Sequence, residues 1–326
     1  MMDGNSLLNF FSKFIKTKLR IFKQKILMNK QFAALIIFAG MTLVSNAQND
    51  SKWNAMEQQV KQKLAEQKAL FAVAFKDLKT GKTLLINEHQ YYHAASTMKT
   101  PVLVEVFKQA AAGKFNLTDS IMVKNSFSSI VDGSPFTLDS ADDGEKELYS
   151  YIGRKRTVYQ LAYDMIIASS NLATNIIIEL VKAENVMKTM KELGANDIKV
   201  LRGVEDSKAF EKGLNNTTTA YNLMLVFEQI AKRKLVSKKA CKEMIKILLD
   251  QQFNTIIPAQ LPANVKVAHK TGSITGIHHD SGIVFLPDGR KYVLVLLSKF
   301  EGAEEGPTTT MASVSKIIYD YMMSTR

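Results

Sequence analysis

The chain has 326 residues, and its content of 46% hydrophobic and 23% charged residues is that of an ordinary globular protein with enough length for a large core. The formal net charge is +12, but residues 1–47 hold seven basic residues and one acid, which leaves +6 for the remainder. Because lysines and glutamates are interspersed in that remainder and no nucleic-acid motif is present, we expect a solvated surface and no nucleic-acid partner.

The first 47 residues end in the pattern of an export signal. Met28-Asn29-Lys30 is a short positive start, Phe32 to Val44 is apolar, and Ser45-Asn46-Ala47 supplies small residues at the spacing used for cleavage. We expect a mature protein that begins at Gln48 and is periplasmic or secreted. The apolar stretch is shorter than the roughly 20 residues of a membrane-spanning helix, so no stable span is expected after cleavage.

Residues 1–27 have two interpretations. Apolar and aromatic side chains alternate there with lysines, which is compatible with a basic amphipathic helix lying on a membrane. The alternative is that the functional start is Met28, because that residue begins a complete signal peptide by itself. We favour the start at Met28.

The pattern after the leader is mixed. A helix is predicted over residues 52–69, followed by two strands, 71–75 and 83–86, with a polar, glycine-containing turn between them. From Ser96 to about Ile257 the pattern is helical and rich in loops, without a strand signal. Apolar helices are predicted near residues 98–111, 157–168, 172–182, 184–193, 218–232 and 238–250.

Strand patterns return near the end of the chain. Residues 265–269, 283–286 and 292–297 are predicted strands, the last two joined by Pro287-Asp288-Gly289-Arg290, and a closing helix is predicted over 310–323. Strands at both ends with helices between them predict an antiparallel sheet built from distant segments and flanked by the first and last helices. The expected fold class is therefore α+β.

This order of elements also predicts how the chain is divided. Residues 48–95 together with 260–326 are expected to form an α/β half, and residues 96–259 a helical half. Residues 1–47 form the leader and signal peptide.

Ser96 and Lys99 stand three residues apart in Ser96-Thr97-Met98-Lys99, which puts both side chains on one face of a helix. A serine hydroxyl is a poor nucleophile until a base removes its proton, and a neutral lysine amine can do so where burial or nearby positive charge lowers its pKa. The free N–H groups of a helix N-terminus would also favour negative charge at Ser96. We predict Ser96 as nucleophile and Lys99 as its base; the alternative is an ordinary helix start.

Two further elements follow in a fixed order. Ser169-Ser170-Asn171 ends an apolar helical run, and Lys270-Thr271-Gly272 closes a short strand. Together with Ser96-x-x-Lys99, this ordered set resembles that of class A β-lactamases and penicillin-binding proteins, and the resemblance extends from about residue 50 to the end of the chain. It implies a β-lactamase/transpeptidase-like fold with the active site in the groove between the two halves.

The resemblance implies a role for each residue of the middle element. Ser169 would pass a proton to the leaving nitrogen of an opened lactam or peptide, and Asn171 would hydrogen-bond a substrate amide. The family usually has Asp where this chain has Ser170, so a structural hydrogen bond is expected to be weaker here. The alternative for all three residues is that they merely cap helices.

The resemblance also implies roles for the last element. Lys270 and Thr271 would bind the substrate carboxylate, and Gly272 would let a ligand approach the strand edge. The backbone N–H groups of Ser96 and Ser273 would form the oxyanion hole.

Hydrolysis of the acyl-serine requires a base that activates water, and this step separates a β-lactamase from a penicillin-binding protein. Class A enzymes carry a Glu followed four residues later by Asn, shortly before a Thr-rich helix start, which Thr217-Thr218-Thr219 matches here. Glu205 is the predicted base, and Glu211 is the competing candidate. Ala209 stands where the Asn is expected, so that partner is missing or shifted to Asn215-Asn216. The alternative for Glu205 is a surface carboxylate.

No metal or cofactor is expected. His269, His278, His279 and Asp280 lack a zinc-binding spacing, and adjacent histidines in a strand point to opposite faces. Cys241 is the single cysteine of the chain, which excludes an intramolecular disulfide, and its helical surroundings favour a small buried side chain.

Three functions remain open at this level. The leading one is an exported serine β-lactamase of class A type, which hydrolyses the lactam amide through an acyl-Ser96 intermediate and would confer antibiotic resistance. The second is a D-Ala-D-Ala carboxypeptidase or related penicillin-binding-type peptidase that acts on peptidoglycan stem peptides. The third is a slow-turnover sensor that binds a β-lactam or a cell-wall ligand. We expect a monomer whose partner is the small-molecule substrate.

Overall fold

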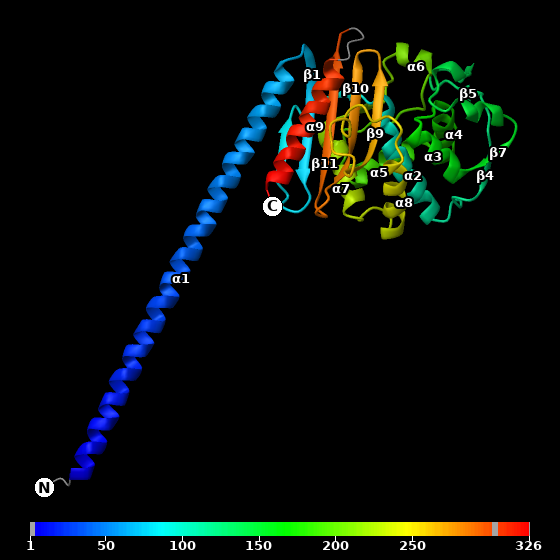
Figure 1. Cartoon of the computed structure of the whole chain (residues 1–326). Helices are drawn as coiled ribbons and strands as arrows, with labels where there is room; N and C mark the ends of the chain where they lie inside the picture. Colours follow the sequence, from blue (N-terminus) through cyan, green and yellow to red (C-terminus); the bar gives the residue numbers. More distant parts are fainter. Residues whose placement is uncertain (1–3, 302–305, 326) are drawn as a thin grey trace. The chain divides into compact units, whose positions relative to one another are not determined.

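The computed structural model describes residues 4–301 and 306–325, with side chains described for all of these except 4–7, 11, 26 and 29–49. The chain divides into two compact units, residues 1–58 with 324–326 and residues 59–323. The sheet and the helices that follow α1 belong to the second unit, and its elements are labelled in Figure 1.

Helix α1 (Gly4–Ala65) begins in the first unit and includes most of the helix predicted over residues 52–69. It ends four residues earlier than predicted, because the chain turns there and strand β1 starts at Ala69. The side chains of 29–49, which make up nearly all of the predicted export signal, lie outside the described residues, so the signal stays a prediction. Among the helices that the structure describes, none is a candidate membrane span by length and hydropathy.

A five-stranded antiparallel sheet is the centre of the second unit, with the strand order β2-β1-β11-β10-β9. Strand β9 forms one edge of this sheet and carries the Lys-Thr-Gly element. Register is continuous along the long strands, from Ala69 opposite Phe300 to Asp77 opposite Tyr292. The strands are β1 (Ala69–Asp77), β2 (Thr83–Ile86), β9 (Lys266–Ile274), β10 (Ile277–Phe285) and β11 (Lys291–Phe300).

The sheet combines segments from both ends of the chain, which confirms the predicted antiparallel sheet and the α+β class. The central strand β11 is buried almost throughout, as expected for a strand covered on both faces. Strands β9 and β10 are longer than predicted because backbone pairing continues through polar residues: Ser273 pairs with His278 and Gly272 with His279. Periodicity of apolar residues does not detect such an extension.

Helices α7 and α9 pack with the sheet. Helix α7 contacts β1, β10 and β11, and α9 lies alongside the strands in Figure 1. The α9 contacts include a hydrogen bond from Ser315 Oγ to Ile257 O of 2.8 Å and one from Arg290 to Met322 O of 2.6 Å. The last helix therefore flanks the sheet, as predicted.

The six predicted internal helices are confirmed to within two residues at each end. Their bounds follow from capping side chains: Thr157, Ser237 and Thr219 each accept a hydrogen bond from a backbone N–H in the first turn of α3, α8 and α7. These six are α2 (Lys99–Ala111), α3 (Val158–Ile167), α4 (Asn171–Val181), α5 (Ala183–Glu192), α7 (Ala220–Ala231) and α8 (Lys238–Leu249). The short helix α6 (Ser207–Glu211) was not predicted, and the closing helix is α9 (Gly306–Ser324).

The expectation that no strand occurs between Ser96 and Ile257 was wrong. Short strands pair there in antiparallel ladders of two or three residues, too short to give a periodic pattern. One of them, β8, pairs with β3 just before the nucleophile segment. They are β3 (Tyr92–His93) with β8 (Thr217–Thr218), β4 (Ser120–Met122) with β7 (Lys155–Thr157), and β5 (Phe127–Ser128) with β6 (Pro135–Phe136); short 3-10 helices are η1 (Ala95–Met98), η2 (Ser140–Asp142) and η3 (Lys146–Tyr151).

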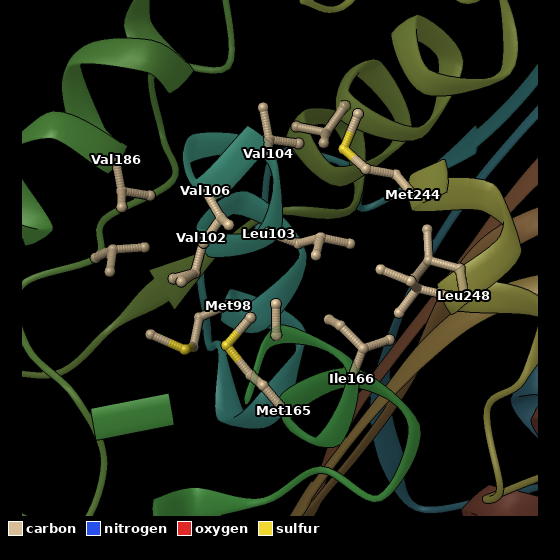
Figure 2. Close-up of a cluster of buried hydrophobic side chains, with 14 of the residues drawn as sticks. Met98, Val102, Leu103, Val104, Val106, Met165, Ile166, Val186, Met244 and Leu248 are labelled. Atoms are coloured by element: carbon tan, nitrogen blue, oxygen red, sulfur yellow. The ribbon is translucent and has the colours of Figure 1, made fainter. Parts of the chain in front are cut away.

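Helix α2 passes through the middle of the largest apolar cluster, and this burial positions the site. Figure 2 shows its side chains Val102, Leu103, Val104 and Val106 among apolar side chains of α3, α5 and α8. Every residue of α2 from Lys99 to Gln109 except Lys108 is buried, so other elements enclose this helix. The N-terminal end of α2, where the nucleophile segment lies, is thereby held by core packing. The division into an α/β half and a helical half stays a prediction.

Candidate active site

Ser96 lies in η1, immediately before α2, and lines an open cavity of about 950 Å³. Its side chain is half-buried and its hydroxyl forms no hydrogen bond with any described residue. The preceding residue, Ala95, has a φ of 45°, in the left-handed region that costs a non-glycine residue about 1 kcal/mol. Its N–H donates to His93 Nδ1 at 3.1 Å, which holds the turn. The nucleophile candidate is thus exposed to the cavity on a strained turn.

Lys99 is fully buried in the first turn of α2, and its ammonium group points to the Ser-Ser-Asn element. Its Nζ donates to Ser169 O at 2.7 Å, to Ser169 Oγ at 3.2 Å and to Asn171 Oδ1 at 2.9 Å. Burial lowers the pKa of Lys99 to about 7, while the negative charges of Asp143 and Glu205 raise it in part. The amine is therefore partly neutral near neutral pH.

Ser169 lies between α3 and α4, and its hydroxyl accepts a hydrogen bond from a second lysine. Lys270 Nζ lies 3.0 Å from Ser169 Oγ and also donates to Thr271 O at 3.0 Å. Burial, followed by the charge of Lys99, holds the pKa of Lys270 well below its usual value. Ser169 adopts a φ of 58°, in the left-handed region that a non-glycine residue rarely adopts. The structure brings Lys99 and Lys270 together around the Ser169 hydroxyl. Among the described residues, Lys99 Nζ forms hydrogen bonds with Ser169 and Asn171 and none with Ser96, so the role of Lys99 as the base for Ser96 stays a prediction.

Asn171 connects Lys99 to Glu205. Its Nδ2 donates to Glu205 Oε1 at 2.6 Å, while its Oδ1 accepts from Lys99. Glu205 is exposed on one side, yet its partial burial raises the pKa of the carboxyl group, an effect that the Asn171 hydrogen bond opposes. The Glu211 carboxylate is exposed at the end of α6 and contacts no polar group among the described residues. Geometry thus favours Glu205 over Glu211.

The predicted asparagine partner of Glu205 is not supplied by the residues before the Thr-rich segment. Asn215 Oδ1 accepts from Arg202 at 3.2 Å, and buried Asn216 accepts from Leu201 N at 2.8 Å. Ala209 is buried in α6. Asn216 holds the backbone of the loop and Asn215 binds the Arg202 side chain; neither forms a hydrogen bond with the carboxylate of Glu205 among the described residues.

The edge strand β9 packs against the nucleophile turn at Gly272. A Cβ at that position would lie 3.0 Å from both Ser96 N and Thr97 N, so the close approach favours glycine. Thr271, Gly272 and Ser273 line the same cavity as Ser96, with Ser273 exposed. The strand edge and the N-terminal end of the helix therefore form two adjoining walls.

Two residues that the sequence analysis did not single out support this set. Asn175, buried one turn after Asn171 in α4, accepts from Val204 N at 2.7 Å and donates to Val204 O at 3.0 Å. Asp143 accepts hydrogen bonds from the first N–H groups of α4. The sequence carried a signal for Asn175, because an asparagine stands within an apolar helical run. It carried none for Asp143, whose partners lie far away in the chain.

Ser170 is buried and caps α4, accepting from Ala173 N at 3.1 Å. The capping interpretation therefore applies to Ser170, whereas Ser169 contacts both lysines and Asn171 contacts Lys99. The Ser170 hydroxyl lies 3.4 Å from Asp143 Oδ2.

The histidines point to opposite faces of β10, as predicted. His278 contacts Thr308 and the ring of Phe300, whereas His279 is buried against Tyr92. His269 pairs with Asp280 at 2.9 Å in a buried position. No group of three or more His, Cys, Asp or Glu side chains among the described residues could hold a metal ion.

Cys241 is buried in α8, as predicted, and its Sγ lies 3.0 Å from Leu235 O. Burial raises the pKa of the thiol, although the Leu235 hydrogen bond opposes this effect. A thiol with a raised pKa is a poor nucleophile.

The comparisons with known proteins agree with this geometry. Beta-lactamase VEB-1 of Pseudomonas aeruginosa is 24% identical over 314 residues, which cover 90% of this chain and 98% of that protein. A β-lactamase of Bacteroides uniformis is 25% identical over 304 residues, covering 89% and 98%.

Among solved structures, PBP-A aligns with a TM-score of 0.71 at 24% identity, over 83% of this chain and 96% of that one. A β-lactamase from Chitinophaga pinensis aligns with a TM-score of 0.72 at 22% identity, over 82% and 99%. These likenesses establish the β-lactamase/transpeptidase-like fold. A model of the β-lactamase enzyme family matches residues 55–322, and the chain therefore belongs to that family.

Proposed function

We propose that this protein is an exported serine β-lactamase that hydrolyses the lactam amide through an acyl-Ser96 intermediate. The observation that carries the proposal is the convergence of Lys99 Nζ and Lys270 Nζ on Ser169 Oγ, at 3.2 and 3.0 Å, beside the cavity that Ser96 lines. Lys99, whose pKa is lowered to about 7, can accept a proton near neutral pH and pass it to the hydroxyl of Ser169.

In the proposed acylation step, Ser96 Oγ attacks the lactam carbonyl carbon and the proton of the hydroxyl passes to the neutral amine of Lys99. The C–N bond of the lactam then breaks. A proton moves from Lys99 to Ser169 Oγ while the hydroxyl proton of Ser169 passes to the leaving nitrogen. The contact between Lys99 and Ser169 supports this route.

Substrate binding is assigned to the walls of the cavity. Lys270 and Thr271 bind the carboxylate of the substrate, and the N–H groups of Ser96 and Ser273 stabilise the oxyanion, each such donor contributing about 3 kcal/mol. Asn171 Nδ2 carries two hydrogens, so it can bind a substrate amide while it donates to Glu205.

In the proposed deacylation step, Glu205 takes a proton from water and the water oxygen attacks the acyl carbon. The bond between that carbon and Ser96 Oγ then breaks, and the proton returns to Ser96 Oγ, which restores both the serine and the carboxylate. The hydrogen bond from Asn171, which lines the same cavity as Ser96, and the raised pKa of Glu205 support this assignment, because a general base must be able to accept a proton. The breakdown of β-lactams by this route would provide antibiotic resistance.

A specific observation favours a second candidate, a D-Ala-D-Ala carboxypeptidase of the penicillin-binding type. Glu205 is exposed, and the one side chain that hydrogen-bonds its carboxylate is Asn171 among the described residues. Ala209 occupies the place of the expected asparagine. If this carboxylate does not hold the attacking water, Ser96 is acylated by penicillins and hydrolyses them slowly.

The test uses residues 48–326, the proposed exported form, mixed with a chromogenic cephalosporin and followed by absorbance and intact mass. Sustained turnover that is lost in Ser96→Ala, and that stalls as a long-lived adduct in Glu205→Gln, supports the β-lactamase. A stoichiometric adduct without turnover supports the peptidase or a sensor. The absence of both adduct and turnover would contradict lactam chemistry.

We propose that the protein acts as a monomer in the periplasm or outside the cell, after removal of residues 1–47. Support comes from the sequence pattern at residues 28–47 and from the family model, whose match begins at residue 55. Mass spectrometry of the protein from a periplasmic fraction would show Gln48 as the first residue.

A further inference from the structure

A buried carboxylate from a distant loop is bound to the N-terminus of α4. Asp143, between η2 and η3, is 4% exposed, and its Oδ2 accepts from Asn171 N at 2.9 Å and from Leu172 N at 2.8 Å. The hydroxyl of Tyr149 donates to the same oxygen at 3.1 Å, and Glu145 N donates to Oδ1 at 2.8 Å. Both oxygens of the carboxylate are therefore satisfied.

These contacts fit the physical needs of a helix start. The first N–H groups of a helix have no partner inside the helix, and the helix dipole favours negative charge at that end. The Ser170 hydroxyl accepts a hydrogen bond from Ala173 N, whereas the Asp143 carboxylate accepts from Asn171 N and Leu172 N. The carboxylate that the Ser-Asp-Asn pattern would place at position 170 is here supplied from position 143, 3.4 Å from the Ser170 hydroxyl.

The loop that carries Asp143 also packs tightly against the end of α3 at the next residue, Gly144. A Cβ at Gly144 would lie 1.8 Å from Ala168 O and 3.6 Å from the ring of Phe253. Such a close approach leaves no room for any residue other than glycine. Asp143 and Gly144 also line the cavity that Ser96 and Ser169 line, so this loop forms part of the wall of the active site.

We propose that Asp143 is a positioning residue, which holds the backbone of Asn171 so that its side chain can bridge Lys99 and Glu205. The inference rests on the proposed function for its effect on acylation. Asn171 Oδ1 lies 2.9 Å from Lys99 Nζ and its Nδ2 lies 2.6 Å from Glu205 Oε1. A displacement of this one residue therefore moves contacts of both proposed catalytic groups.

The test replaces the carboxylate and then restores it at the neighbouring position. In protein expressed from the full chain, Asp143→Asn is expected to lower the acylation rate by a penicillin by roughly tenfold to a hundredfold, the range in which small displacements act. The double variant Asp143→Asn/Ser170→Asp is expected to regain most of the rate, because its new carboxylate lies near the same N–H groups. The matched control Glu147→Gln removes an exposed charge from the same loop and is expected to leave the rate unchanged.

A second readout does not depend on lactam chemistry. Amide hydrogen exchange at Asn171 and Leu172, and the NMR signal of the Asn171 side-chain amide, are expected to change in Asp143→Asn, to recover in the double variant and to stay unchanged in Glu147→Gln. Unchanged exchange in Asp143→Asn overturns the inference. A changed exchange with a normal acylation rate also overturns it, because the contact would then be structural.

The two readouts separate this inference from the proposed function. If the unsubstituted protein is not acylated, the proposed function fails, and the exchange rates together with the Asn171 side-chain signal still decide whether Asp143 holds Asn171. If Asp143→Asn does not fold, Asp143→Glu serves in its place, since it keeps the charge but adds one methylene that shifts the oxygens. A rate and an exchange pattern identical to the unsubstituted protein in that variant would contradict the inference.

Discussion

Lys99 shows how the surroundings of one residue set its chemistry. The amine of Lys99 is buried in the first turn of α2, and this burial lowers its pKa to about 7. The negative charges of Asp143 and Glu205 limit that decrease. A lysine in water would be almost entirely protonated at neutral pH. Its position in the fold therefore turns an ordinary cation into a group that can accept a proton.

We predict that the acylation rate rises with pH through about 7 and reaches a plateau above it, because neutral Lys99 is the base. In Glu205→Gln the midpoint is expected to fall, since the charge of Glu205 raises the pKa of Lys99. Stopped-flow mixing with a penicillin between pH 5 and 9, followed by intact mass, measures both profiles. A rate that does not change over this range would remove Lys99 from the base role.

At the scale of elements, two asparagines one turn apart in α4 connect the parts of the candidate site. Asn171 faces Lys99 and Glu205, and Asn175, one turn later, binds both backbone groups of Val204. The loop that carries Glu205 is thereby attached to the same helix that carries Asn171. Glu205 itself has a φ of 61°, so the loop needs this attachment to maintain a strained backbone.

We predict that Asn175→Ala slows deacylation by roughly tenfold to a hundredfold and acylation much less, because the loss displaces Glu205 while Lys99 and Ser169 stay in place. Leaving the Val204 N–H and C=O without partners also lowers the free energy of unfolding by about 1–3 kcal/mol. The accumulation of acyl-enzyme by intact mass measures the first effect. Asn185→Ala, which removes a similar side-chain contact in α5, is the control and is expected to leave both rates unchanged.

The elements and residues that sequence analysis missed share a physical cause. Periodicity predicted the long helices closely, because each buries an apolar face over several turns. It missed β3 and β8, which are short, and it missed Asp143 and Asn175, whose roles depend on partners far away in the chain. The proximity of Lys99, Ser169 and Lys270 could be anticipated because the order and local spacing of the motifs carry that signal, whereas the catalytic roles of Ser96, Lys99 and Lys270 stay predictions.

At the scale of the molecule, the compact unit begins at residue 59, and the family model matches from residue 55. We predict that removal of residues 1–47 leaves the melting temperature nearly unchanged, because the buried hydrophobic side chains among the described residues all lie at Trp53 or later. Calorimetry of the full and shortened chains measures this. A large decrease in the shortened chain would show that the leader contributes to the fold.

We predict that the free energy of unfolding depends on pH through the buried side chain of His279. This side chain is completely buried, and burial lowers its pKa from 6.5 to about 4. Between these two pH values the unfolded chain binds more protons at His279 than the folded chain does. The free energy of unfolding is therefore highest above pH 6.5 and decreases as the pH falls to 4. The shift corresponds to about 3 kcal/mol.

The variant that isolates this effect is His279→Gln, with His89→Gln, an exposed histidine, as the control. Urea unfolding at pH 4.5 and pH 7 is expected to show a smaller difference for His279→Gln than for the unsubstituted protein, whereas His89→Gln should match the latter. His279 contacts His93 O, two residues before the strained turn at Ala95, and it also contacts the backbone of β11 at Ser298 N. Nε2 donates to His93 O in both protonation states, so protonation leaves that bond in place. The added proton sits on Nδ1, where it removes the hydrogen bond that the ring accepts from Ser298 N, and the buried charge together with this lost contact to β11 lowers stability at low pH.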